Sequence, residues 1–304
     1  MLWNRTKISK KPSSFSRASS SAAPREQPNS LPASFRVDLH AHSLWSDGEW
    51  PPEEVARLGR ESGVSAMALT DHDCVDGLPA FMEAAQGFTP ICGVEISARD
   101  HEHDVHILGL LIDPVNARLR ERLQGLAEAR EIRLALIIEK LARVGVPLRR
   151  EDIAAHCRIG TVGRPHVAMA LVSSGAAETV DEAFRLYLRR RTPAYVPMTG
   201  PTPAEVIEWV HDAGGVAVLA HPGLARNLAP VRGYADAGLD GIEVWHPKHG
   251  PGMRNACLDV SKRLGLVPSG GSDYHGPRVG DSQVGQEPVP LEVLERLRER
   301  RPRR

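Results

Sequence analysis

The chain has 304 residues, of which 41% are hydrophobic, so it is long enough for one large domain or for a domain with an inserted lobe. Its 38 basic and 38 acidic residues balance, which excludes a positive electrostatic field over the whole protein. We therefore expect no surface for long nucleic acid, and any anionic ligand needs a local binding site. Four scattered cysteines without a C-x-x-C motif favour reduced thiols, and no run of about 18 apolar residues is present to span a bilayer. These features predict a cytoplasmic protein with no membrane partner, and they carry no indication of its oligomeric state.

Residues 1–34 are rich in serine, proline and basic side chains, and no acidic residue precedes Glu26. Such a composition buries too little apolar surface to fold alone, which predicts a disordered N-terminal tail. An organellar transit segment has a similar composition and is the alternative interpretation.

Seven short apolar segments follow, at residues 36–39, 65–70, 89–97, 103–112, 215–220, 240–245 and 265–271. Helical patterns alternate with them, which predicts βα units whose parallel strands are buried on both faces. One of the helices is well delimited. It has Thr202 as its N-cap, Pro203 at the first helical position, Glu205 three residues after the cap, and Gly214 at its end.

The strand signal disappears between about residue 115 and residue 200, where long helical patterns replace it. We therefore predict a barrel formed by residues 35–114 and 201–290, with an α-helical insertion at 115–200 that contributes to substrate binding. Residues 291–304 are expected to form a C-terminal helix with a basic end, which a partner-binding tail would also explain.

Polar side chains of metal-binding type gather at the predicted strand ends. They are His40, His42, Asp47, Asp71, His72, Asp73, Glu95, His106, His221, Asp273 and His275. Each motif taken alone has a structural explanation, such as an Asx turn or an imidazole bound to backbone or water. In a barrel of parallel strands, however, the C-terminal strand ends meet over one site, so we predict that these side chains share one pocket.

Several buried carboxylates and imidazoles in one pocket would destabilise the fold unless cations held them together. Imidazole and carboxylate ligands without thiolates suit manganese, iron or zinc. The number of ligands exceeds what one ion needs, so we expect two or three divalent ions, with Mn²⁺ first and Fe²⁺ or Zn²⁺ as alternatives.

The motifs H-x-H-x-x-x-x-D, T-D-H-D, G-x-E, H-x-L-G, A-H-P and S-D-x-H, in this order over residues 36–285, resemble the PHP (polymerase and histidinol phosphatase) family of metal-dependent phosphoesterases. The resemblance implies an α/β fold, a distorted (βα)7 barrel. It also implies three ligand sets: His40, His42, Glu95 and Asp273; Glu95, His106 and His221, with Glu95 bridging; and Asp47, His72 and His275.

Within the family, the insertion, the arginine of "EARE" and the motif "GRPH" resemble phosphatases of 3′,5′-nucleoside bisphosphates such as pAp, some of which are 5′ exonucleases of short RNA. The resemblance implies that Arg130, Arg164 and His166 bind a substrate phosphate, with a small nucleotide or short RNA as the partner. Arg133 is expected to face water, because a helix with many arginines usually presents them to solvent.

Two ions that share a water molecule can lower its pKa and present hydroxide to phosphorus. We expect His221 and Asp273 to orient this hydroxide, and His275, or Asp47 through water, to protonate the leaving alcohol. Asp71 and Asp73 are expected either to hydrogen-bond a ligand imidazole or to cap a turn, and Asp38 to hydrogen-bond His42.

Two alternatives remain open at this point. One is another phosphomonoesterase of the same family, such as a histidinol phosphatase. The other is a non-catalytic metal-binding module, against which the nine predicted ligands argue, because a structural ion is usually closed by four.

Overall fold

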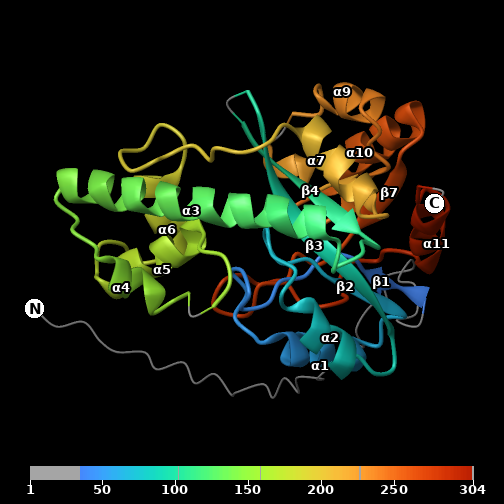
Figure 1. The fold of residues 1–304 in the computed structure, drawn as a ribbon, viewed down its shortest axis with the longest axis horizontal. Coiled ribbons are helices and arrows are strands. Elements are labelled where there is room, and N and C mark those ends of the chain that lie inside the picture. The colour runs from blue at the N-terminus through green and yellow to red at the C-terminus, as the bar shows by residue number, and fades with distance from the viewer. Residues whose placement is uncertain (1–34, 102, 158, 226, 303–304) are drawn as a thin grey trace, which may run out of the picture. The chain divides into compact units, whose positions relative to one another are not determined.

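The computed structural model describes residues 35–101, 103–157, 159–225 and 227–302 (Figure 1). The N-terminal tail predicted at residues 1–34 and the last two residues of the basic end lie outside the described residues. No helix within the described residues combines the length and apolarity needed to cross a membrane.

Seven strands form one sheet in chain order, which confirms the predicted α/β class. They are β1 (Val37–Asp38), β2 (Ala66–Leu69), β3 (Thr89–Asp100), β4 (His103–Leu110), β5 (Val216–Leu219), β6 (Gly241–Trp245) and β7 (Val267–Gly270). Backbone hydrogen bonds join the segments that follow β1 and β7: His42 N donates to Tyr274 O (2.9 Å) and Asp273 N to His40 O (2.9 Å). The sheet is therefore a nearly closed barrel.

The expectation that all strands are parallel is wrong for β4, which runs antiparallel to both β3 and β5. The reason lies in the connection between β3 and β4, because only two residues separate Asp100 from His103. A parallel pair needs a crossover of about a dozen residues, whereas a hairpin needs only a short turn. The first residues of β4, rather than its last ones, consequently lie at the end of the barrel that carries the site.

Alternate strand residues point into the barrel and form an aliphatic layer, which includes Ile91 of β3, Leu108 of β4 and Val218 of β5. The predicted C-terminal helix is present as α11 (Leu291–Glu299), and it adds Val293, Leu294 and Leu297 to this cluster. Because α11 covers one end of this aliphatic layer, the polar residues that share these inward-facing strand positions lie at the opposite end of the barrel.

Helices pack on the outer face of the barrel (Figure 1). They are α1 (Pro52–Ser62), α2 (Leu78–Ala84), α7 (Pro203–Asp212), α9 (Val231–Asp236) and α10 (Pro251–Leu264); the short helix α8 (Pro222–Ala225) follows β5. The N-terminus predicted for α7 is confirmed: Thr202 Oγ1 accepts from Glu205 N, while the Glu205 carboxylate accepts from Thr202 N.

The described residues between β4 and α7 contain helices and no strand: α3 (Ala117–Arg143), α4 (Arg150–Ala154), α5 (Arg164–Ser173), α6 (Val180–Ala183) and the π-helical turn η2 (Phe184–Leu188). Figure 1 shows α3 running past α5 and α6. Leu134 and Ile137 of α3 pack with Val167 and Leu171 of α5 in a core cluster separate from the barrel clusters. The division of the chain into barrel and insertion at residues 115 and 200 stays a prediction.

Candidate metal centre

Glu95 lies at the centre of the predicted site. It projects from the middle of the long strand β3, on the same strand face as Ile91, and it is fully buried. Its Oε2 atom lies 3.2 Å from Nε2 of both His40 and His42, and its Oε1 atom lies 2.8 Å from His106 Nδ1 and from His221 Nε2. One carboxylate therefore contacts four imidazoles from three separate motifs.

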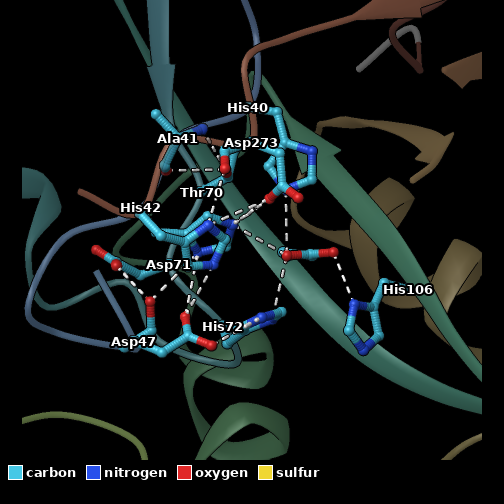
Figure 2. Close-up of polar contacts among 12 residues, drawn as sticks. His40, Ala41, His42, Asp47, Thr70, Asp71, His72, His106 and Asp273 are labelled. Atoms are coloured by element: carbon cyan, nitrogen blue, oxygen red, sulfur yellow. Dashed lines mark hydrogen bonds and ion pairs between the residues drawn. The ribbon is translucent and has the colours of Figure 1, made fainter. Parts of the chain in front are cut away.

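The residues implied as the first ligand set converge closely. The Nε2 atoms of His40 and His42 are 3.0 Å apart, and Asp273 Oδ1 lies 3.3 Å from His40 Nε2 (Figure 2). Together with Glu95 they offer four ligand atoms within 4.8 Å of one another. Such a convergence of lone pairs is the arrangement that a cation requires.

A second group forms beside the first. His275 Nε2 lies 3.2 Å from Asp47 Oδ1, and His72 Nε2 lies 3.6 Å from Asp47 Oδ2. His42 completes this group, so that it belongs to two clusters. A third cluster combines His72 and Glu95 with His106, which reaches the site because β4 is reversed. The structure thus brings all nine predicted ligands into one contiguous site.

Two of these residues have strained backbones. His221 has a φ of 28° and Asp273 a φ of 47°, in the left-handed region that side chains disfavour. Hydrogen bonds hold both conformations, since His221 N donates to Glu243 Oε2 (2.6 Å) and Asp273 N donates to His40 O (2.9 Å). Strain of this kind is concentrated at functional sites in proteins.

Sequence reasoning missed Glu243, which is fully buried in β6 and accepts a hydrogen bond from His40 Nδ1 (3.0 Å). The sequence feature that could have indicated this residue is a single acidic side chain within the apolar segment "GIEVW". His246 is also buried, and its Nε2 lies 3.1 Å from Asp273 Oδ2. Because Lys248 N donates to His246 Nδ1, Nε2 carries the proton and donates to Asp273.

The three aspartates near the motifs have structural contacts. Asp71 accepts from Ser43 N and from the hydroxyls of Ser43 and Ser46, each at 2.7 Å, which is the turn-capping alternative. Asp73 pairs with Arg130. The expectation for Asp38 is wrong: its carboxylate accepts from the backbone of residues 272 and 285 and does not contact His42, because β1 ends before the chain bends toward the site.

Electrostatics within the site favour ionised carboxylates. Burial alone would raise the pKa of Glu95, but His72, His106 and His40 hold it well below its usual range. Burial lowers the pKa of the His72 imidazole to about 3, so this ring is neutral and able to ligate. Asp47 Oδ1 and His72 Nδ1 are buried and form no hydrogen bond of regular geometry, although His275 Nε2 lies 3.2 Å from the first atom and Glu95 Oε2 lies 3.1 Å from the second. The neutral His72 imidazole beside ionised carboxylates fits divalent cations, so these clusters are able to bind metal ions.

A cavity of about 120 Å³ lies directly beside these clusters. Asp47, His72 and His106 line one side of it, and three arginines, Arg130, Arg133 and Arg164, line the other. We call it the arginine cavity. The expectation that Arg133 faces water is wrong: its side chain is 10% exposed, and its Nε donates to Val196 O (2.8 Å). Burial, and then the charge of Arg164, lowers the pKa of Arg133 to about 10.

The other predicted substrate residues are held differently. Arg130 is buried, with Nε donating to Asp73 (2.7 Å) and Nη2 to Ser97 Oγ (2.9 Å). Arg164 is the first residue of α5, and its Nη2 atom lies 3.2 Å from Asp104 Oδ2. His166 is buried and accepts from Gly163 N (2.9 Å), so that it caps the first turn of α5.

The chain is similar to known proteins over most of its length. A 3′,5′-nucleoside bisphosphate phosphatase from Chromobacterium violaceum is 35% identical over 265 residues, which cover 82% of this chain and 90% of that protein. The 5′-3′ exoribonuclease Rnm from Salmonella typhimurium is 35% identical over 249 residues, with 79% and 85% covered. A solved structure from Bifidobacterium adolescentis superposes with a TM-score of 0.82 at 32% identity, covering 90% of this chain and 98% of that one.

The model of the PHP domain matches residues 38–145, which contain the H-x-H, T-D-H-D, G-x-E and H-x-L-G motifs. These matches agree with the barrel and with the clusters of imidazoles and carboxylates. The chain belongs to the PHP domain family.

Proposed function

We propose that this protein hydrolyses the 3′-phosphate of 3′,5′-nucleoside bisphosphates and removes nucleotides from the 5′ end of short RNA. Its family and its clusters of metal-binding residues make it a metal-dependent phosphoesterase. The finer assignment is supported by two relatives, one named a 3′,5′-nucleoside bisphosphate phosphatase and the other a 5′-3′ exoribonuclease.

The position of the arginine cavity carries this assignment. The cavity shares His72 and His106 with the metal-binding clusters, so a phosphate at the clusters and a second phosphate at the arginines would be neighbours. Guanidinium groups suit phosphate because they stay charged and donate in a planar fork. Asp73 pairs with Arg130, and Asp104 lies near both Arg133 and Arg164, so three arginines face two aspartates and a second phosphate would balance the excess positive charge. In our proposal Arg130 and Arg164 bind the 5′-phosphate together with Arg133, and His166 keeps the start of α5 in place.

The ligand sets that we propose are those implied by the sequence, and two or three divalent ions, Mn²⁺ first, would occupy them. When bound, the ions would lower the pKa of water and neutralise phosphate oxygens. The free state of all four cysteines supports a location in the reducing cytoplasm.

The side chains have separate roles in the proposed reaction. Water attacks the 3′-phosphorus, the bond from phosphorus to the nucleoside 3′-oxygen breaks, and that oxygen takes a proton. His221 and Asp273 orient the attacking water. His275, or Asp47 through a water molecule, delivers the proton to the leaving oxygen; the two side chains lie 3.2 Å apart.

The experiment that tests this proposal is a hydrolysis assay with Mn²⁺ on a panel of esters, which follows phosphate release from the monoesters and mononucleotide release from the RNA. The panel contains pAp, a short 5′-phosphorylated RNA, histidinol phosphate, and phosphoribosyl 1,2-cyclic phosphate, the substrate named for a relative 32% identical over 257 residues. We expect the highest kcat/KM for pAp. A higher kcat/KM for histidinol phosphate would instead favour the alternative phosphomonoesterase.

A variant with His40→Ala and His42→Ala serves as the control for contaminating phosphatases. Both imidazoles belong to the cluster with Glu95 and Asp273, so we expect phosphate release to fall at least about a thousandfold, as loss of a principal catalytic element does. Full activity of this variant would assign the hydrolysis to a contaminant.

A further inference from the structure

A second cavity, of about 300 Å³, shares His106 with the arginine cavity and also contacts His221. It lies between the β3–β4 hairpin and the helices α8 and α9 that follow β5. Its volume is within the range of pockets that bind small molecules, roughly 300 Å³ and above. Neither the ligand sets nor the arginine cavity accounts for it.

The wall formed by α8 and α9 is apolar. Pro222, Leu224, Pro230, Val231 and Tyr234 line it. Leu224 is 51% exposed, although it borders a concave surface next to polar groups. An exposed leucine in such a position provides apolar contact area for a ligand.

The charges around this cavity disfavour a phosphate. Asp100 and Asp104 line it, and Arg164 is the one arginine or lysine among its described lining residues. Arg164 also lines the arginine cavity, where two further arginines are present. An anion would therefore be drawn into the arginine cavity, and an uncharged group fits the second cavity better.

We propose that the second cavity is the nucleobase subsite, an inference that rests on the proposed function. With the 3′-phosphate at the metal centre and the 5′-phosphate at the arginines, the base is the remaining part of the nucleotide. The two cavities share Asp104, His106 and Arg164, so that one ribose can extend into both.

Tyr234 supplies the aromatic surface of this subsite. Its hydroxyl donates to Asp100 Oδ2 (2.6 Å), which ties α9 to the end of β3 and holds the ring at the cavity wall. Bases commonly contact aromatic side chains in nucleic-acid-binding proteins, and such a contact changes affinity by roughly five- to a hundredfold.

The test compares pAp with an analogue whose base is replaced by hydrogen, 1-deoxyribose 3,5-bisphosphate, on the wild-type protein loaded with Mn²⁺. Both compounds carry the same two phosphates, so only the base subsite distinguishes them. We expect kcat/KM for the analogue to be at least about tenfold lower. Equal values for the two compounds would overturn the base subsite while leaving the bisphosphatase intact.

If neither compound is hydrolysed while another ester of the panel is, the proposed function fails and the subsite fails with it. Products give an independent readout, because AMP is expected to inhibit at concentrations about tenfold lower than ribose 5-phosphate. Inhibition at equal concentrations would contradict the inference.

Leu224→Ala localises the effect, and its half-exposed side chain makes misfolding a minor concern. We expect kcat/KM for pAp to fall about fivefold with no change for the abasic analogue. Leu136→Ala is the matched control, since Leu136 is 43% exposed on α3 and does not line either cavity. A fall of equal size for pAp and the abasic analogue in Leu224→Ala would overturn the assignment of this wall to the base.

Discussion

Glu243 accepts a hydrogen bond from His40 Nδ1 at 3.0 Å, and both side chains are fully buried. Because Nδ1 donates to Glu243, Nε2 is the His40 atom that faces Glu95 and Asp273 and would bind an ion. The second oxygen of Glu243 accepts from the backbone of His221. One carboxylate thus sets the tautomer of one proposed ligand and the strained backbone of another.

Glu243→Gln is expected to weaken metal binding about 10- to 100-fold, because glutamine has one acceptor oxygen for two donors. Either the His221 N–H loses its acceptor or the His40 tautomer reverses and directs N–H into the cluster. The measurement is metal content after dialysis, together with a titration against a chelator.

Asp240→Asn is the matched control for this variant. Asp240 is a buried carboxylate just before β6 that accepts from His211 Nε2 and from Ala217 N, both at 2.8 Å, away from the metal-binding clusters. We expect its metal content to equal that of the wild type. Wild-type metal affinity in Glu243→Gln would show that Glu243 does not position His40.

Removal of metal is expected to lower stability. The carboxylates of buried Asp47 and Glu95 and of partly buried Asp273 lie close together, and divalent ions would offset their repulsion. Ions that bind only the folded state, present at 100 times their Kd, add about 2.7 kcal/mol to the free energy of unfolding.

Calorimetry of protein treated with a chelator, before and after addition of Mn²⁺, measures this effect as a rise in Tm. His42→Ala should abolish most of the rise, because His42 belongs to two clusters. An unchanged Tm on adding Mn²⁺, Fe²⁺ or Zn²⁺ would contradict metal binding.

The ion pair between Asp73 and Arg130 joins the loop after β2 to α3, with Asp73 fully covered and Arg130 9% exposed at its side chain. Arg130→Met is expected to lower the free energy of unfolding by about 3 to 5 kcal/mol, because it leaves a buried carboxylate without its partner. Urea denaturation gives this value directly.

The double variant Asp73→Asn with Arg130→Met should recover part of the loss, since no buried charge remains unpaired. Arg164→Met tests the neighbouring arginine, whose side chain is 25% exposed. We expect it to raise KM for pAp with little change in stability. If Arg130→Met unfolds at the wild-type urea concentration, the ion pair contributes no stability.

Gly160 lies where residues 160–161 contact the loop after β1. Its φ is 73°, and a Cβ built on it would lie 1.8 Å from Trp45 O, next to the hydrogen bond from Thr161 N to Trp45 O (2.9 Å). Gly160→Ala is therefore expected to displace this contact, lowering stability by about 2 to 4 kcal/mol and reducing kcat/KM, because Asp47 lies in the same loop.

Gly175→Ala is the control, because Gly175 has a similar φ of 77° and no atom within 4 Å of a built Cβ. It should cost only the left-handed strain, about 1 kcal/mol, and leave kcat/KM unchanged. Thermal unfolding and steady-state kinetics compare the two variants. Equal losses of stability and of kcat/KM in both would show that the close contact between Gly160 and Trp45 O is unimportant.

Much of the site was predictable because metal-binding residues occur in short motifs. His40 and His42 are two residues apart, and Asp273 and His275 follow the last predicted strand, so their chemistry is visible within a few positions. The burial of Arg130 and Arg133 could not be predicted in this way. Both lie on one helix, and only the packing of α3 in the tertiary structure buries them.

The sequence by itself determined the seven strands, the residue types at their ends and the family, because hydrophobic alternation and ligand motifs are local properties of the chain. The tertiary structure decided how β4 is directed, which carboxylate holds His40, and which arginines face the metal centre. These features depend on contacts between segments as far apart as His40 and Glu243, and side-chain type alone does not encode which of the many possible partners will be nearest.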